Sequence, residues 1–122
     1  MDHTLVHFEL PADDAGALAK FYTDLFGWKI EKTPGPAEYW LIETAPEGKG
    51  VMGGMMKRQV PQQGPLMYFQ VESADDYIAK IKSLGGVVVM DKHAVPGMGY
   101  FAVAVDPQGN PFAIWEENEA AA

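Results

Sequence analysis

The chain has 122 residues, 48% of them hydrophobic, a formal net charge of −8 and no cysteine. This length and composition predict one compact domain with a real core, and the lack of cysteine excludes thiol catalysis, thiolate-bound zinc and disulfides. The negative charge argues against nucleic acid and anionic membranes as partners. No apolar run approaches the length of a membrane span, and the N-terminal residues lack the pattern of a signal peptide, so we expect a cytoplasmic protein.

One pattern occurs twice along the chain. Residues 5–28 and 66–86 each contain an alternating apolar stretch, a small cluster of N-capping residues, an apolar pattern of helical period and a glycine. Two copies are too few for a solenoid, so the repeat predicts two half-domains packed as one pseudo-symmetric unit.

The first copy predicts the order β-α-β-β-β. Residues 5–10 alternate with a period of two, which is typical of a half-buried strand, and Pro11 is expected to end it. Asp13 is the expected N-cap of a helix that Gly27 terminates. The apolar stripe of this helix is expected to consist of Leu18, Phe21, Tyr22 and Leu25. Three more strands are expected over residues 28–33, 38–44 and 51–56.

The second copy predicts the same order of elements. The polar residues 57–65 are the expected linker between a first module of about residues 1–57 and a second of about residues 66–117, with 118–122 as a loose tail. Ser73 is the expected N-cap of the second helix. Its inner stripe is expected to be Tyr77, Ile78, Ile81 and Leu84. Strands are expected over residues 66–71, 87–90, 100–105 and 112–116, with a loop over residues 92–99 that contains His93 and a hairpin turn over residues 106–110.

Two motifs fit this framework, HFELPADD…FYTDLFGW in the first half and VPGMGYFAVAVDPQGNPFAIWE in the second. With the duplicated pattern, they resemble the vicinal oxygen chelate superfamily, which includes glyoxalase I, fosfomycin- and bleomycin-resistance proteins and extradiol dioxygenases. The resemblance covers nearly the whole chain and is strongest to glyoxalase-like members without an assigned substrate. It implies an α+β fold in which two tandem βαβββ modules form a cup-shaped, partly open mixed β-sheet with helices on the outside, commonly completed by a homodimer.

For the catalytic members, the resemblance also implies one divalent metal held by residues on four strands. At the position of the metal enzymes' carboxylate this chain has Ala113, and Glu116, three residues further, is expected on the opposite face. Residues 48–71, which include two of the four ligand strands, contain no Asp, Glu or His, and Gln70 would be a poor ligand. Only His7 remains, so we predict no cofactor and no metal site. A divalent metal with ligands elsewhere is the alternative.

Without a metal, the concave face is expected to form an aromatic and methionine-lined pocket. His7, Glu9 and Tyr68 are the candidate catalytic residues, because a buried carboxylate beside an imidazole holds its tautomer and raises its pKa. The candidate ligand-binding residues are Trp40, Met52, Met55, Gln70, Tyr100, Ala113 and Trp115. A hydrogen-bonded structural role explains His7 equally well, and ordinary core packing explains the methionines and Trp115.

The sequence therefore predicts a glyoxalase-like protein that binds a small apolar or aromatic molecule without the family's metal, as a homodimer. One alternative is an enzyme of lyase, isomerase or dioxygenase type acting on a small carbonyl or vicinal-oxygen substrate. Such an enzyme would use His7 and Glu9 as acid–base groups, or a divalent metal whose ligands are not placed. Another alternative is a dimeric module whose cavity is filled by side chains.

Overall fold

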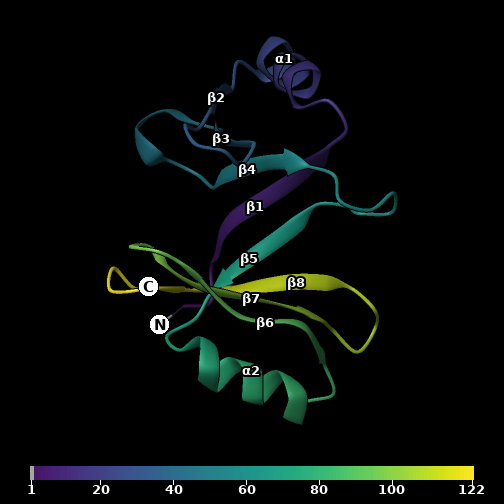
Figure 1. Cartoon of the computed structure of the whole chain (residues 1–122), viewed down its shortest axis with the longest axis vertical. Helices are drawn as coiled ribbons and strands as arrows, with labels where there is room; N and C mark the ends of the chain where they lie inside the picture. Colours follow the sequence, from purple (N-terminus) through teal and green to yellow (C-terminus); the bar gives the residue numbers. More distant parts are fainter. Residues whose placement is uncertain (1) are drawn as a thin grey trace. The chain divides into compact units, whose positions relative to one another are not determined.

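The computed structural model describes residues 2–122, so residue 1 of the expected first module lies outside the described residues. The chain forms two compact units: the first unit is His7–Leu66, and the second unit is Met67–Ala122 together with the N-terminal residues up to Val6. Each contributes a βαβββ succession of elements (Figure 1). The α+β class and the duplicated order of elements are therefore confirmed.

The first unit is built from one helix and four strands, with a short 3-10 turn at Pro46–Gly48. The elements are β1 (Leu5–Ala12), α1 (Ala15–Phe26), β2 (Lys29–Lys32), β3 (Tyr39–Glu43) and β4 (Met52–Lys57). The strands follow the order β2-β3-β4-β1, with β1 parallel to β4 and the other pairs antiparallel. Pro11 does not end β1, because the ladder continues beyond it: the backbone N–H of Arg58 donates to the Ala12 carbonyl at 2.9 Å.

Helix α1 begins one residue later than expected. Asp14, not Asp13, is the N-cap, and its carboxylate accepts from the backbone N–H of Ala17 at 3.0 Å. The helix ends as expected at Gly27, whose left-handed φ of 72° suits glycine. The expected apolar stripe is wrong at Phe21 and Leu25, which are 56% and 55% exposed.

The first unit's core lies between α1 and one face of its sheet. Small alanines of α1 are buried there, and they let the helix pack closely on the strands. The core residues are Phe8, Leu10, Ala12, Ala15, Leu18, Ala19, Trp28, Ile30, Trp40, Ile42 and Met55. We call the opposite side of each unit's sheet, away from its helix, the far face.

The second unit repeats this arrangement. Its elements are β5 (Leu66–Gln70), α2 (Ala74–Ser83), β6 (Val87–Val95), β7 (Gly99–Val105) and β8 (Pro111–Glu117). The order is β5-β8-β7-β6, with β5 parallel to β8 and the other pairs antiparallel. The core between α2 and the sheet contains Val71, Ala74, Tyr77, Ile78, Ile81, Tyr100, Ala102, Phe112 and Ile114.

Several local expectations are tested in the second unit. Ser73 caps α2 and accepts from the backbone N–H of Asp76 at 3.2 Å, as predicted. The turn after β7 also forms as predicted, around the Asp106 carboxylate. The loop expected over residues 92–99 is wrong, because β6 continues through His93 to Val95, with register shifts that absorb the irregular spacing.

The end of the chain is held against the second unit, unlike the loose tail expected for residues 118–122. Ala121 is buried, and its carbonyl accepts from the backbone N–H of Gly97 at 2.9 Å. Asn118 donates its backbone N–H to the Met98 carbonyl at 2.8 Å. These bonds close the turn between β6 and β7 against the residues that follow β8.

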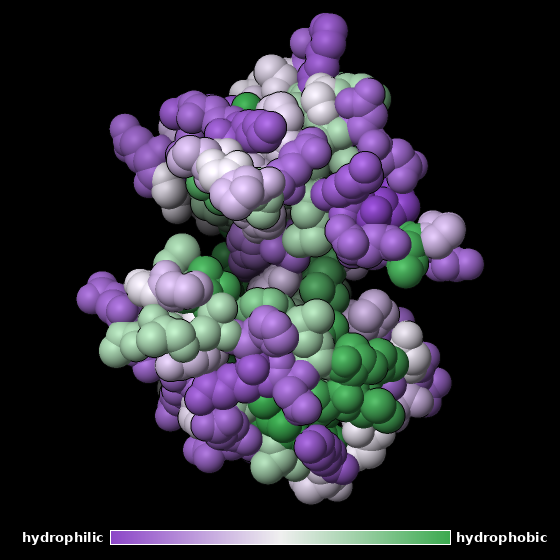
Figure 2. All heavy atoms as spheres, in the orientation of Figure 1, coloured by the Kyte–Doolittle hydropathy of each residue, from purple (hydrophilic) through white to green (hydrophobic). Residues whose placement is uncertain are grey.

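An apolar surface remains exposed where α2 ends and β6 begins (Figure 2). Leu84, which was expected in the inner stripe of α2, lies just beyond the helix and is 70% exposed. Val87 and Val89 on β6 are also exposed, and β6 is the last strand in its unit's order. Among residues 2–122, no helix has both the length and the apolar character needed to cross a membrane.

Candidate functional site

The far face of the first unit carries a polar group surrounded by apolar side chains. Strand register places His7 beside Met52 and Glu9 beside Gly54 in the pairing of β1 with β4. In the pairing of β3 with β4, Leu41 lies beside Gly54, and Tyr39 lies beside Met56. Since paired residues point to the same side of a sheet, these side chains share one face. Lys29, Glu31 and Glu43 form ion pairs at its edge.

Three side chains of this face form a hydrogen-bonded chain. The Tyr39 hydroxyl donates to Glu9 Oε2 at 2.9 Å and lies 2.9 Å from Nε2 of His7. Nε2 of His7 and Oε2 of Glu9 are 3.6 Å apart. The side chains of His7 and Glu9 are 27% and 14% exposed, so the group is partly buried yet reachable from solvent.

Gly54 makes the position of Tyr39 possible. A Cβ atom at residue 54 would lie 1.8 Å from the Tyr39 hydroxyl oxygen, so the phenol occupies the space that any side chain there would need. Burial, followed by the negative charge of Glu9 and the hydrogen bond to it, raises the pKa of Tyr39 above its usual value. The phenol therefore keeps its proton at ordinary pH and remains a donor to Glu9.

The structure separates the candidate ligand-binding residues of the first unit. Met52 lies on the far face with His7 and Glu9. Trp40 and Met55 pair with each other and belong to the core beneath α1, so the expectation that they line the same face as His7 is wrong. The reason is the alternation along β3 and β4, which sends Tyr39 to the far face and Trp40 to the helix.

Sequence reasoning missed Tyr39. A signal for it was present in the adjacent glycines of β4, since glycine within a strand often marks the close approach of a large group. Gly53 lies under the ring of Phe8 on the helix side, and Gly54 lies under Tyr39 on the far face. Each glycine of the pair therefore makes room for one aromatic ring.

The far face of the second unit is mostly aromatic. Register places Tyr68 beside Ala113 and Gln70 beside Trp115, and the neighbouring strands add Phe101 and His93. The ring centroids of Tyr68 and Phe101 are 6.2 Å apart, and those of His93 and Phe101 are 5.7 Å apart.

Tyr100 does not belong to this far face, although it was a candidate ligand-binding residue. It packs against α2 in the core of the second unit, and the Lys92 ammonium lies 4.2 Å from its ring centroid. Trp115 does lie on the far face and covers Gly99, where a Cβ atom would come within 2.7 Å of the indole. Of the candidates in this unit, the structure therefore groups Tyr68, Gln70, Ala113 and Trp115.

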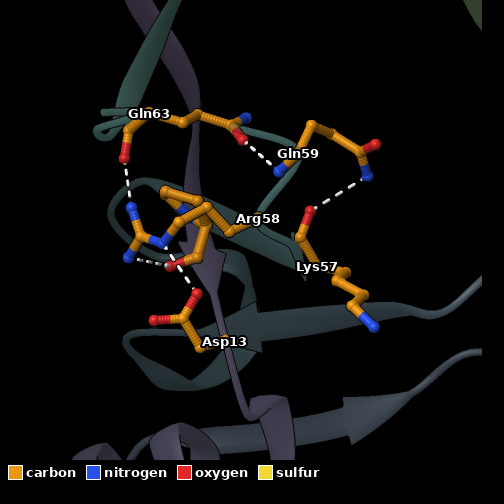
Figure 3. A network of polar contacts seen from close by, with 6 residues as sticks. Asp13, Lys57, Arg58, Gln59 and Gln63 are labelled. Atoms are coloured by element: carbon orange, nitrogen blue, oxygen red, sulfur yellow. Dashed lines mark hydrogen bonds and ion pairs between the residues drawn. The ribbon is translucent and has the colours of Figure 1, made fainter. Parts of the chain in front are cut away.

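A shallow surface hollow lies beside Arg58 in the first unit, lined by Asp13, Gln59, Val60 and Pro61. Nε of Arg58 donates to Asp13 Oδ1 at 3.1 Å, Nη2 donates to the Pro11 carbonyl at 3.5 Å, and Nη1 donates to the Gln63 carbonyl (Figure 3). All three guanidinium nitrogens thus bind protein oxygens. We interpret this network as a structural tie between the segment after β4 and the end of β1.

Comparison with known proteins assigns the fold to a family. Residues 4–114 match the family model described as the Glyoxalase/Bleomycin resistance protein/Dioxygenase superfamily. The anthracycline biosynthesis protein DnrV of Streptomyces peucetius is 30% identical over 128 residues, which cover 90% of this chain and 46% of that protein. The chain thus spans about half the length of this relative. A glyoxylase-like domain-containing protein of Didymella fabae is 30% identical over 112 residues, covering 87% of this chain and 88% of that protein.

A solved structure shows the same fold. The glyoxalase/bleomycin resistance protein/dioxygenase superfamily member from Vibrio splendidus 12B01 superposes with a TM-score of 0.70 at 13% identity, covering 95% of this chain and 99% of that one. At this identity the likeness supports the fold alone.

Members of this superfamily often use a divalent metal, which several donor side chains must hold together. Among residues 2–122, no group of three or more His, Asp or Glu side chains is close enough together to hold a metal ion. On the far face of the first unit, His7 and Glu9 are two such donors, and both are hydrogen-bonded to Tyr39. These residues do not fit a catalytic metal, which wants at least three protein ligands, and we derive no step through one.

Proposed function

Since the chain belongs to the Glyoxalase/Bleomycin resistance protein/Dioxygenase superfamily, as its motifs predicted, we propose that it binds a small aromatic molecule carrying hydroxyl or carbonyl groups. Members of this superfamily bind small molecules. The observation that carries the proposal is the His7–Tyr39–Glu9 chain on the far face of the first unit, flanked by Met52 and Leu41. Apolar side chains of this kind bind an aromatic ring by burying its surface, and a few polar groups at defined positions fix the orientation of the ring.

The relatives suggest a ligand class. DnrV is an anthracycline biosynthesis protein, and anthracyclines are polycyclic aromatic compounds with hydroxyl and quinone carbonyl groups. A thioether and an aliphatic side chain beside an imidazole, a phenol and a carboxylate suit such a molecule, because methionine adapts to flat and irregular apolar surfaces. We therefore propose a polycyclic hydroxyquinone, or a molecule of similar chemistry, as the ligand.

Further contacts and properties complete the proposal. Tyr68, Gln70, Ala113 and Trp115 are a second group of proposed ligand-binding residues, which lie together on the far face of the second unit. Dimers are common in the superfamily, and we propose a homodimer, supported by the exposed valines of the outer strand β6, since proteins usually cover such edges. Sedimentation at micromolar concentration tests it, and a monomer would contradict it. We also propose a cytoplasmic location and binding without a metal.

Binding can be tested with 2-hydroxyanthraquinone as the probe, followed by tryptophan fluorescence quenching. Met52→Ala is expected to raise Kd about tenfold, because it removes roughly 1.4 kcal/mol of apolar contact. The matched control is Met98→Ala in the turn after β6, where the methionine is 60% exposed. Absence of saturable quenching, or equal effects of the two substitutions, would contradict the proposed site.

A second candidate is an enzyme that moves a proton on a small carbonyl compound. The imidazole, phenol and carboxylate in one hydrogen-bonded chain favour it, since a histidine held this way is suited to general base catalysis. Exchange of the α-protons of hydroxyacetone in deuterated water, followed by NMR, measures this directly. Exchange that is lost in His7→Gln, with binding of 2-methoxyanthraquinone retained, would favour the enzyme over a binding protein.

A further inference from the structure

The direction of the hydrogen bonds on the far face of the first unit defines the protonation of His7. A phenol carries one proton, and an ionised carboxylate only accepts. The Tyr39 hydroxyl gives its proton to Glu9 Oε2. Its contact with His7, 2.9 Å from Nε2, must therefore be a bond in which Nε2–H donates to the phenol oxygen.

We propose that Tyr39 is the positioning residue of this site: it keeps a proton on Nε2 of His7, so that His7 gains and loses its other proton at Nδ1. The assignment holds for both charge states of the imidazole, because the phenol oxygen accepts from Nε2–H whether the ring is neutral or cationic. Glu9 acts on His7 through Tyr39.

The distances support a bridging phenol rather than a direct contact. Nε2 of His7 and Oε2 of Glu9 are 3.6 Å apart, which exceeds the range of a good N–H···O bond. Both bonds to the Tyr39 oxygen are 2.9 Å. Gly54 leaves the space that the Tyr39 phenol occupies, since a side chain at position 54 would displace the phenol.

One consequence concerns the ligand and rests on the proposed function. A neutral imidazole with its proton on Nε2 has its lone pair at Nδ1, so a ligand group that hydrogen-bonds to His7 must donate O–H or N–H. In a proton transfer, the ligand O–H bond breaks, an Nδ1–H bond forms, and the ligand oxygen keeps the electron pair as a phenolate or enolate. The site would thus select hydroxyl-bearing ligands over their ethers.

The protonation of His7 can be measured without any ligand. In protein labelled with nitrogen-15, a long-range proton–nitrogen correlation spectrum at a pH of about 8, where a histidine is mostly neutral, distinguishes the two ring nitrogens. His7→Gln identifies the signals of His7 among the three histidines. We expect a protonated Nε2 with an observable Nε2–H signal, and an unprotonated Nδ1.

Two pairs of variants test the cause. Tyr39→Phe removes the acceptor oxygen, and Gly54→Ala displaces the phenol, so both are expected to lose the Nε2–H signal through faster exchange with water. The controls are Tyr22→Phe on α1, where the ring stacks on Trp28, and Gly64→Ala, where a Cβ atom meets open space. Both controls should keep the signal, and backbone amide spectra verify that every variant is folded.

Each outcome decides between the alternatives. A neutral wild-type His7 with its proton on Nδ1 overturns the proposal, as does an unchanged Nε2–H signal in Tyr39→Phe. The expected preference for hydroxyl-bearing ligands over their ethers is tested by comparing the binding of 2-hydroxyanthraquinone with that of 2-methoxyanthraquinone. The hydroxyl compound should bind more tightly by at least tenfold, and His7→Gln should remove the difference. Equal binding of the two compounds refutes the donor requirement alone, whereas failure of both to bind refutes the proposed function and leaves the His7 assignment standing.

Discussion

Replacing Met55 with alanine tests whether this residue belongs to the core of the first unit or to its far face. Met55 is fully buried and packs with Trp40 and Ile42 beneath α1. A buried Met→Ala substitution costs about 2–5 kcal/mol, because the transfer free energy of the lost atoms adds to that of the remaining cavity. We expect about 3 kcal/mol here, which is a large part of the roughly 5–15 kcal/mol typical of whole domains.

Urea denaturation followed by circular dichroism measures this loss. With a slope of about 1.5 kcal/mol per molar urea for a domain of this size, the midpoint should fall by about 2 M. Met98→Ala is exposed and should change the free energy of unfolding by no more than about 0.5 kcal/mol. Met52→Ala should change it by about 1 kcal/mol, because Met52 is only partly buried.

Binding of 2-hydroxyanthraquinone should show the opposite order. Met55→Ala is expected to keep Kd within about twofold of wild type, since the residue faces α1, whereas Met52→Ala weakens binding about tenfold. The reasoning fails if Met55→Ala abolishes binding while its urea midpoint changes little, because Met55 would then face the ligand.

Three further predictions follow from named contacts. In a urea titration, Asp14→Ala should lower the free energy of unfolding by about 1 kcal/mol through loss of the N-cap. Asp13→Ala removes only an exposed ion pair, so it should lower the free energy of unfolding by less than about half as much. Hydrogen bonds from Asn110 and Gln108 lower the pKa of Asp106 below its usual 3.8. The stabilisation by the ionised Asp106 carboxylate is therefore fully present above the usual pKa and is lost as pH falls through the lowered pKa. Asp106→Ala should destabilise the protein more at about pH 7 than at about pH 2.5. In an absorbance titration of the phenols, Tyr39→Phe should leave the ionisation near pH 10 unchanged, because the pKa of Tyr39 is raised. A reduction of that ionisation by one group in Tyr39→Phe would contradict the burial of Tyr39.

The family, the duplicated order of elements and the caps at Ser73 and Gly27 could be predicted from the sequence. These features rest on local patterns, such as periodicity, capping residues and turn residues, which survive folding almost unchanged. The choice of Asp13 over Asp14 failed because two adjacent carboxylates give the same local signal, and only the φ and ψ angles of Asp14 distinguish them.

The facing of side chains was harder to predict. A period of two shows that Tyr39 and Trp40 point to opposite sides, but it does not say which side the helix covers. Trp40, Met55 and Tyr100 were therefore assigned to the ligand, and the structure places them in the two helix-covered cores. Phe21 and Leu25 were assigned to a core for the same reason. A helical stripe shows which residues share one face of the helix, but it does not show which face packs against the sheet, and both residues are exposed.

The interlocking of Tyr39 with Gly54 restricts how this sequence can evolve. A lineage that first replaces Gly54 meets a clash with the phenol, so selection would remove it before a second change arrives. A lineage that first exchanges Tyr39 for a smaller residue gives up the bridge between His7 and Glu9 but opens the space, after which position 54 can drift. Homologues should therefore pair a bulky residue at 39 with glycine at 54, and any residue larger than glycine at 54 should occur with a small one at 39.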